Sequence, residues 1–506
     1  MIYFLIPKTN LLTYTKLDYK STNVMTTYLD SYVIELVKPE MSRDYSEDYA
    51  PPGLQCSSDP LLKKEQHVLI SPSLSYYLSN IKEKINVHDK EWDIFKKYTN
   101  PYEYIHTLIP NKKKCVSKIK TLSRSYFKMI EIIHVFKLLN EFSIIDSINN
   151  GCILDDPIST SSGSDDENNL LPTNSSDDSS ISKNNEMFSD SLPIFSRNPK
   201  ICRLKPTYQP IKTFHLCEGP GGFIQAIVEM RKNPMDTYIG MTILDDKENY
   251  DIPAWKKSEA FLRENPNVSI ENGLDGTGDI LNIDNFIYCK EKYASSMDIM
   301  TGDGGFDFSM DFNKQEMNIC KLLFAQIAYA LCLQKRGGSF VLKIFDCFMN
   351  STVDLIYLLS SFYEKVYITK PQTSRYANSE KYLVCKNFLF SSCEDFYPFL
   401  LDVFRKMVGG GDLGVGGQPE KGQPERFLSI MISNHFLTKM EEFNSIFGQQ
   451  QIENIYYTIS LIETKNKTEK IDHLIRNNVQ KCVGWCMKYG VGYNQITNAN
   501  VFLAGV

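Results

Sequence analysis

The sequence is poor in the features that assign a chain to a specialised class of protein. Its 13 cysteines include no Cys-x-x-Cys pair, and Cys482 and Cys486 lack the two further ligands of a zinc module, so no metal site is expected. No apolar run approaches the ~20 residues of a membrane-spanning helix, and the apolar start of the chain is too brief for a secretion signal. We expect a cytoplasmic protein with reduced thiols and no membrane partner.

A strong charge of one sign is also missing, but the small total hides an uneven distribution. The 55 Lys and Arg residues nearly balance the 61 Asp and Glu residues, which gives a net charge of −6. Residues 151–190 alone hold nine acidic residues and one lysine, a net charge of −8, so the rest of the chain carries +2. Residues 157–190 are rich in Ser, Asp and Asn and cannot bury enough apolar surface to offset the entropy of ordering them. We expect a disordered acidic insertion there.

Downstream of this insertion, short apolar runs alternate with helical patterns. The runs that we expect to be strands are 213–217, 237–241, 297–300, 339–345, 365–369 and 381–388. Between the third and fourth runs, Ile319, Leu323 and Ile327 recur on one face of a helix that should stop at Gly337-Gly338, where glycine can turn the chain back. Such alternation predicts a doubly wound, mostly parallel α/β domain over residues 200–405, with helices on both faces of the sheet.

Four further regions surround this domain. Residues 1–110 form a flanking region in which we identify no chemistry, and 111–156 contain a helix, expected over 122–142, that leads into the domain. The Gly/Pro-rich stretch 408–425 has no strand leading into it, so it is interpreted as a flexible linker rather than a phosphate-binding loop. Residues 427–506 are expected to be helical, since helical spacing relates Ile452, Ile455, Tyr456, Ile459 and Ile462.

The clearest chemical signal follows the first expected strand. Residues 218–223 read Glu-Gly-Pro-Gly-Gly-Phe, and a helix should start near Gly222. A glycine-rich turn at the end of a strand lets a ligand lie against the backbone at the helix N-terminus. Neither the GxGxxG pattern of a dinucleotide site nor the Lys-Ser/Thr of a triphosphatase is present. An acidic residue before the glycines suits a ligand with a positive charge beside an amino acid group, such as S-adenosylmethionine; the alternative is a tight turn without a ligand.

The segment LCEGPGGF resembles the cofactor loop of the FtsJ-like ribose 2′-O-methyltransferases. Other segments resemble the parts of that family that carry its chemistry, namely SRSYFKMIEI (123–132), TGDGGFD (301–307), GGSFVLKIFD (337–346) and SRYANSEKYLVCKNF (374–388). The resemblance is closest to the cap-specific mRNA 2′-O-methyltransferases of eukaryotes and to the FtsJ-like proteins of large cytoplasmic DNA viruses. It covers about residues 120–390 without the insertion. The family implies a Rossmann-like methyltransferase fold and an antiparallel last strand.

The resemblance also implies roles for individual residues. Its catalytic tetrad would be Lys128, Asp303, Lys343 and Glu380, in which Lys343 steers or deprotonates the ribose hydroxyl and the others fix its position and charge. The S-adenosylmethionine site would comprise Glu218, Gly219, Pro220, Gly221, Gly222, Phe223 and Asp279, with Asp245 as a secondary candidate. The substrate-binding residues would be Arg124, Arg375, Asn378 and Ser379.

The order of the strands supports this tetrad independently of the resemblance. In an open parallel sheet, ligands bind at the carboxyl ends of the strands. Asp303 ends one expected strand and Lys343 lies near the end of the next, so both belong at that edge. Glu380 begins the last strand and reaches the same edge only if that strand is antiparallel, through a hairpin that turns at Pro371. Lys128 must be brought in by its helix.

Several alternatives remain open from the sequence alone. The expected partner is RNA, most simply the first transcribed nucleotide of capped mRNA, with a protein of the capping apparatus as a further partner; ribosomal or transfer RNA is the alternative substrate. A catalytically silent subunit that binds RNA or a partner is the other class. Trp255 and Tyr376 could stack on bases or pack in the core, and Tyr376 stands where relatives often have proline. The expected location is the cytoplasm, including a viral factory or virion, or the nucleus for a cellular enzyme.

Overall fold

The computed structural model describes residues 1–9, 70–139, 209–244, 254–305, 315–408, 426–428, 432–466 and 468–495. Apart from Gln209, these residues belong to one unit of the chain. The acidic insertion 157–190, residues 409–425 of the expected linker and the candidate Asp245 lie outside the described residues. The expectations made for them stay predictions.

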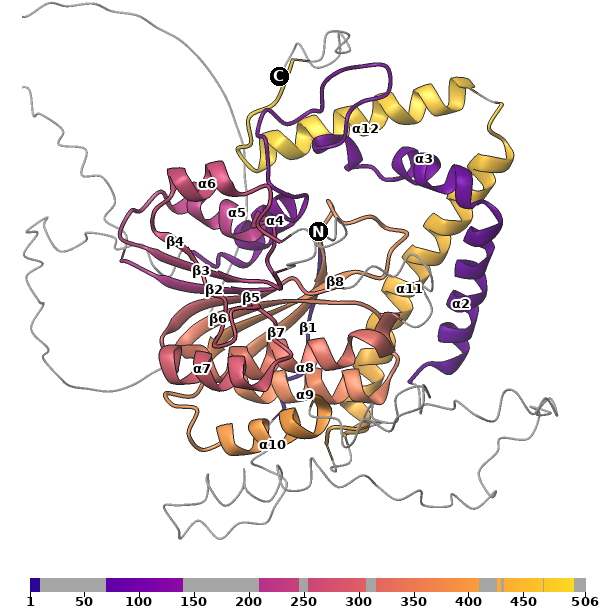
Figure 1. Ribbon diagram of the computed structural model, residues 1–506. Helices are drawn as coiled ribbons and strands as arrows, with labels where there is room; N and C mark the ends of the chain where they lie inside the picture. The colour runs from indigo at the N-terminus through magenta and orange to yellow at the C-terminus, as the bar shows by residue number, and fades with distance from the viewer. Residues whose placement is uncertain are drawn as a thin grey trace, which may run out of the picture. The chain divides into compact units, whose positions relative to one another are not determined.

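One mixed sheet of eight strands forms the centre of the fold, in the order β1-β7-β8-β6-β5-β2-β3-β4 (Figure 1). The strands are β1 (Ile2–Leu5), β2 (Lys212–Leu216), β3 (Thr237–Met241), β4 (Val268–Ile270), β5 (Met297–Gly302), β6 (Gln334–Ile344), β7 (Tyr363–Lys370) and β8 (Lys381–Phe388). Strands β4, β3, β2, β5 and β6 are parallel to one another, whereas β8 lies antiparallel between β6 and β7. The doubly wound α/β fold and the antiparallel last strand are therefore confirmed.

Helices cover both faces of this sheet (Figure 1). They are α2 (Pro72–Val87), α3 (Asp89–Thr99), the short 3-10 helix η1 (Glu103–Ile105), α4 (Ser125–Phe136), α5 (Gly222–Arg231), α6 (Glu259–Glu264), α7 (Ile283–Tyr293), α8 (Gln315–Leu333), α9 (Asn350–Phe362), α10 (Tyr397–Val408), α11 (Asn434–Glu463) and α12 (Thr468–Lys488). Side chains of α4 and α5 form one apolar core with the sheet, and those of α7, α8 and α9 form the other. The strands read as continuous apolar runs because a parallel sheet is buried on both faces.

Helix α8 corrects one expectation. By length and composition it could cross a membrane, although no run in the sequence was expected to be long and apolar enough. In the fold, 83% of the apolar stretch of this helix is buried, and the helix contacts β5, β6, α9 and α10. Its apolar surface is thus used by the core, which needs a helix that is hydrophobic on nearly all sides.

Helix ends also differ from the predicted ones. Helix α8 ends at Leu333 and β6 begins at once, so Gly337 does not cap the helix. Instead Gly337 lies within β6 with φ +82°, where the pairing of β6 with β5 shifts register. Helix α4 is shorter than the expected 122–142, because Lys137 adopts a left-handed conformation directly after Phe136. Strands β1 and β4 were not predicted.

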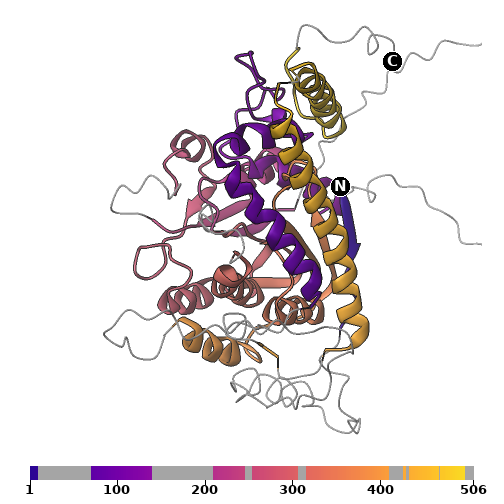
Figure 2. The same cartoon turned by 90° about the vertical axis from the view of Figure 1, so that its right-hand side faces the viewer.

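The two ends of the chain pack together around the sheet. Strand β1 pairs with β7 at the sheet edge, and α2 and α3 contact the long helix α11, which Figure 2 shows beside the indigo α2. Ile452, Ile455, Ile459 and Ile462 of α11 are buried in this contact, whereas Tyr456 is exposed, contrary to the expected stripe. Helix α12 contacts η1. The flanking region and the helical tail therefore belong to the same unit as the α/β core.

A buried histidine in the central strand leads to a prediction about acid stability. His215 of β2 is fully buried, with hydrogen bonds of 2.8 Å to the hydroxyls of Thr213 and Thr301. Burial lowers the pKa of His215 to about 3. In the unfolded chain the pKa would be about 6.5, so the unfolded state binds the proton first as the pH falls. The stability from neutral His215 is intact above about pH 6.5 and is lost as the pH falls toward the folded value.

We expect His215→Gln to reduce this sensitivity to acid. Glutamine can keep hydrogen bonds to the two threonines but does not titrate. Between about pH 7 and about pH 5, the free energy of unfolding should fall by about 2 kcal/mol less in the variant than in the wild type. Urea unfolding of the full chain at both pH values measures this difference. An equal fall in both proteins would show that His215 does not contribute.

Candidate active site

The glycine-rich loop connects β2 to α5 at the carboxyl edge of the sheet. Gly221 has φ +106°, a backbone conformation that glycine adopts without strain. A Cβ atom on Gly222 would overlap the hydroxyls of Ser123 and Ser125, at the start of α4. The loop therefore needs these glycines for two reasons: one makes the turn, and the other lets α5 approach α4 closely.

Glu218 begins this loop and is only 3% exposed. Its Oε1 atom accepts hydrogen bonds from the backbone N–H groups of Phe223 (2.6 Å) and Ile224 (3.2 Å), at the N-terminus of α5. Its Oε2 atom is buried and has no hydrogen-bond partner among the residues that the structure describes. Burial, followed by the charge of Asp303, raises the pKa of Glu218 well above its usual value. A buried carboxyl group with one unpaired oxygen is suited to receive a positively charged ligand group, because the charge of that group favours the ionised form of the acid.

Two further segments meet beside the loop at the end of β3. Gly278 has φ +68°, and a Cβ atom there would collide with the carbonyl of Thr242. Asp279 follows this contact; its Oδ1 accepts from the Leu281 backbone at 2.9 Å, and the side chain is half-buried. Trp255 packs against the bare backbone of Gly240, so its ring is part of the core. The structure thus brings Asp279 to the same edge as the loop.

The four residues of the expected tetrad form two ion pairs. Lys128 Nζ lies 2.7 Å from Glu380 Oε1 and 2.8 Å from Glu380 Oε2. Lys343 Nζ lies 3.3 Å from Asp303 Oδ1 and donates to the Asp303 carbonyl at 2.6 Å. Tyr382 joins the pairs, since its hydroxyl donates to Asp303 Oδ1 at 3.1 Å and its ring lies 5.9 Å from Lys128 Nζ. The geometry therefore brings together side chains from α4, β6 and β8, from the end of β5 and from the loop just before β8.

The pKa values of Lys128 and Lys343 are shifted in opposite directions. Burial lowers the pKa of Lys128, and the charges of Glu380 and Asp303 offset this only in part. Burial would also lower the pKa of Lys343, but the charges of Asp303 and Glu380 outweigh it and raise the pKa above its usual value. Burial would raise the pKa of Glu380, but the charges of Lys128 and Lys343 lower it strongly. Glu380 is thus held as a carboxylate, and Lys343 keeps its proton near neutral pH.

One face of α4 positions the loop between β7 and β8. Arg124, Lys128 and Glu131 are spaced by four and three residues, so they lie on the same side of the helix. Arg124 donates to the Thr373 carbonyl at 2.7 Å, while Glu131 accepts from the Thr373 N–H and hydroxyl at 2.8 and 2.7 Å. Because Thr373 is held from both sides, Lys128 meets Glu380 in a fixed geometry.

Sequence reasoning missed Glu131 and also Glu103, which lies in the flanking region. Glu103 is fully buried and accepts from Arg375 at 2.6 and 3.0 Å and from Arg124 at 3.1 Å. Helical spacing after Lys128 could have identified Glu131. No local pattern marks Glu103, because its two partners are distant in sequence.

The remaining substrate candidates are held by the protein itself. Lys370 donates to the carbonyl and side-chain oxygen of Asn378, at 2.7 and 3.0 Å. Ser379 is buried and donates to Gln315 at 2.6 Å, while Tyr376 is half-buried in the same loop. The structure therefore places Asn378 and Ser379 in the framework of the loop, and Arg375 and Arg124 around Glu103.

The clamp on Thr373 gives a testable consequence. We expect Glu131→Ala to lower the free energy of unfolding by about 1–3 kcal/mol, because it leaves the buried donors of residues 372–373 unpaired. Local opening of the loop should also speed tryptic cleavage after Arg375 several-fold, measured by mass spectrometry. Glu229→Ala is the matched control, since Glu229 accepts from Tyr126 and Gln225 outside this loop. Unchanged cleavage after Arg375 would contradict the clamp.

Known proteins resemble the part of the chain that contains the glycine-rich loop, Asp303, Lys343 and Glu380. Residues 200–388 match the family model of the FtsJ-like methyltransferases. The cap-specific mRNA (nucleoside-2′-O-)-methyltransferase 2 of Danio rerio is 31% identical over 50% of this chain and 33% of its own length. The cap-specific mRNA (nucleoside-2′-O-)-methyltransferase 1 of Trypanosoma brucei brucei is 35% identical over 34% of this chain and 46% of its own length.

A solved structure of a putative ribosomal RNA methyltransferase from Plasmodium falciparum aligns with 35% of this chain and 87% of its own. It shows 25% identity and a TM-score of 0.26. The matches to the cap-specific relatives of Danio rerio and Trypanosoma brucei brucei span less than half of the length of each. The family match and the sequence identity to these relatives agree on one assignment: the chain contains an FtsJ-like methyltransferase domain.

Proposed function

We propose that this chain is an S-adenosylmethionine-dependent RNA ribose 2′-O-methyltransferase that acts on capped mRNA, at the first transcribed nucleotide. The observation that carries the proposal is the convergence of Lys128–Glu380 and Lys343–Asp303 beside the loop of Glu218. Pairs of lysines and acids at the edge of a methyltransferase sheet suit the activation of a hydroxyl. The cap-specific names of the relatives support capped mRNA as the substrate over ribosomal or transfer RNA.

The residues of the loop fit the proposed cofactor. The unpaired Glu218 Oε2 would accept a hydrogen bond from the amino group in the methionine part of S-adenosylmethionine. The backbone of residues 219–223 would line that part of the cofactor. Asp279, at the end of the neighbouring segment, would accept from the adenine amino group. When bound, S-adenosylmethionine supplies an electrophilic methyl group on a positively charged sulfur. Every other part of the reaction falls to the side chains of this chain.

Lys343 would orient the ribose hydroxyl. Its protonated ammonium, held by Asp303, donates a hydrogen bond to the 2′-oxygen, so that a lone pair of that oxygen points at the methyl carbon. The 2′-oxygen would then take up the methyl group, the electrons of the broken C–S bond would stay on the sulfur, and the hydroxyl proton would pass to solvent water. Lys128 and Glu380 fix the position of this centre through their ion pair. Orientation is the larger contribution, because it replaces a bimolecular encounter by a fixed geometry.

Arg124 and Arg375 would face the substrate. Their guanidinium groups share the carboxylate of Glu103, so the group of three side chains keeps a net positive charge. Arginine forks are well matched to phosphate oxygens. Asn378 and Ser379 would act indirectly, by holding the loop that carries Arg375.

Transfer of labelled methyl groups tests the proposal directly. The full chain should methylate a capped transcript and leave the matched uncapped transcript nearly unmodified, and nuclease mapping should place the label on the ribose of the first transcribed nucleotide. Lys343→Ala should reduce the rate at least a hundredfold, an effect of the size expected for a positioned catalytic group. Lys335→Ala, an exposed lysine in β6, is the control. Wild-type transfer by the folded Lys343→Ala variant would overturn the assignment.

The pH dependence distinguishes a lysine that orients the hydroxyl from a lysine that removes its proton. Because the pKa of Lys343 is raised, single-turnover rates of the wild type should stay flat between about pH 8 and about pH 10. Asp303→Asn removes the negative charge that does most to raise the pKa of Lys343, while Lys343 stays buried. The pKa of Lys343 should therefore fall in this variant. The slower rate of that variant should then decrease as the pH rises. A wild-type rate that rises tenfold per pH unit would instead identify Lys343 as the base.

A further inference from the structure

The segment that leads into α4 has an unusual charge distribution. Between Glu103 and Glu131 the sequence contains seven Lys and Arg residues and no Asp or Glu. Two of them, Arg124 and Lys128, are paired with Glu103 and Glu380 in the site already described. The other five precede the helix: Lys112, Lys113, Lys114, Lys118 and Lys120. We refer to these five residues as the lysine track.

All five side chains of the lysine track are exposed. None forms an ion pair with any residue that the structure describes, whereas many other exposed lysines, such as Lys335 and Lys406, have an acidic partner. The backbone under the track is ordered: Ile109 N donates to the Lys114 carbonyl at 3.1 Å, and Lys112 N donates to the Ile109 carbonyl at 2.9 Å. The fold therefore presents a set of uncompensated positive charges on a fixed turn.

The inner end of the track adjoins the loop of the proposed cofactor. Leu122 N donates to Gln225 of α5 at 2.8 Å. A Cβ atom on Gly221 would lie 3.3 Å from Leu122 Cδ1, so this residue covers the glycine-rich turn. Two residues later the chain reaches Arg124 and enters α4. The lysines thus lie along the stretch of backbone that passes the glycine-rich turn and leads into α4.

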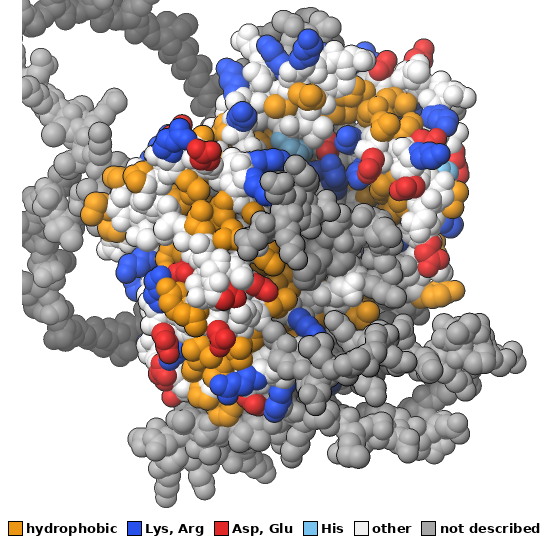
Figure 3. Space-filling model, viewed as in Figure 1, with side chains coloured by type: hydrophobic (Ala, Val, Ile, Leu, Met, Phe, Trp, Pro, Cys, Tyr) orange, Lys and Arg blue, Asp and Glu red, His pale blue; other side chains and the backbone are white. Residues whose placement is uncertain are grey.

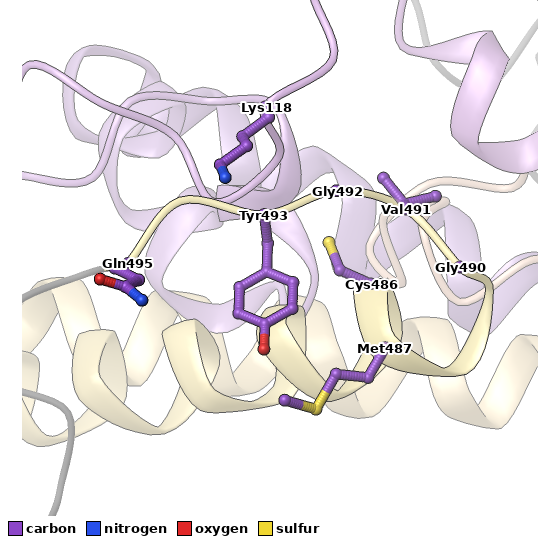
Figure 4. A pocket seen from close by; sticks show the side chains of 8 residues that line it. All are labelled: Lys118, Cys486, Met487, Gly490, Val491, Gly492, Tyr493 and Gln495. Atoms are coloured by element: carbon purple, nitrogen blue, oxygen red, sulfur yellow. The ribbon is translucent and has the colours of Figure 1, made fainter.

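The middle of the track is fixed by residues 492–494 near the C-terminus. Lys118 N donates to the Gly492 carbonyl at 2.8 Å, and Asn494 N donates to the Val116 carbonyl at 2.8 Å. Lys118 and Tyr493 line a hollow of about 450 Å³ with Met487 of α12 (Figure 4). Figure 3 shows Lys and Arg side chains gathered at the top of the view, where Figure 1 shows the indigo loop and α12.

We propose that the lysine track binds the phosphate backbone of the RNA strand whose ribose is presented to the tetrad. The inference rests on the proposed function and adds a binding surface to it. A single strand of RNA carries one negative charge per nucleotide, and exposed lysines without acidic partners gain most from replacing its counterions. The half-buried Tyr493 ring beside Lys118 offers an aromatic surface of the kind that stacks on bases.

A triple variant of the full chain tests the track, namely Lys112→Ala/Lys113→Ala/Lys114→Ala. At about 50 mM salt it should bind a capped RNA of about 20 nucleotides roughly tenfold more weakly, measured by fluorescence anisotropy of a 3′ label. Between about 50 and 200 mM salt, its slope of log affinity against log salt should be smaller by about 2, since each lost phosphate contact removes ~0.7. Binding of a capped trinucleotide and of S-adenosylmethionine should not change.

Lys335→Ala/Lys365→Ala/Lys406→Ala is the matched control, with the same change of charge at exposed lysines of β6, β7 and α10. An equal loss of RNA affinity in this control, or an equal loss for the trinucleotide, would overturn the proposal. Unchanged affinity of the triple variant for the long RNA would also overturn it. Binding is read without methyl transfer, so a wild type that binds RNA in this way but transfers no methyl group would refute the proposed function alone.

Discussion

The buried ion pair between Lys128 and Glu380 is the contact on which the site depends. The two residues are 252 positions apart, and each would be costly to bury alone. Their pairing requires that α4 and the β7–β8 loop stay in register, and the same face of α4 supplies Arg124 and Glu131 to hold Thr373. The helix therefore contributes more than Lys128, because it also fixes the loop that carries Glu380, the partner of that lysine.

The direction of β8 is the second constraint. Asp303 follows β5 and Lys343 lies near the end of β6, so parallel strands alone bring them to one edge. Glu380 precedes β8 and reaches that edge only because β8 runs antiparallel between β6 and β7. Tyr382 then lies opposite Lys343 in the β6–β8 ladder and bridges to Asp303. A parallel last strand would place Glu380 at the opposite edge of the sheet.

Much of this arrangement could be predicted from the sequence, because it depends on local patterns and strand order. The six expected strands and the loop of Glu218 follow from such patterns, whereas the antiparallel β8 was expected because the tetrad implied by the resemblance needs Glu380 at the same edge. Glu103 could not be predicted, since its role comes from two arginines that only the tertiary fold brings to it. The protonation of Lys343 was equally inaccessible: it depends on whether burial or the charge of Asp303 dominates, which is decided by distances.

The pairing of charges inside the site also bears on how RNA would be attracted to it. The two lysines and two acids of the tetrad cancel, so the centre itself offers little net field to a polyanion. Arg124 and Arg375 share the charge of Glu103 and leave only one positive charge in excess. Attraction over distances of several ångströms must therefore come from charges that lack acidic partners. Among the described residues near the start of α4, the lysine track is such a set, and under the proposed function its position would separate the binding of the strand from the chemistry on one ribose.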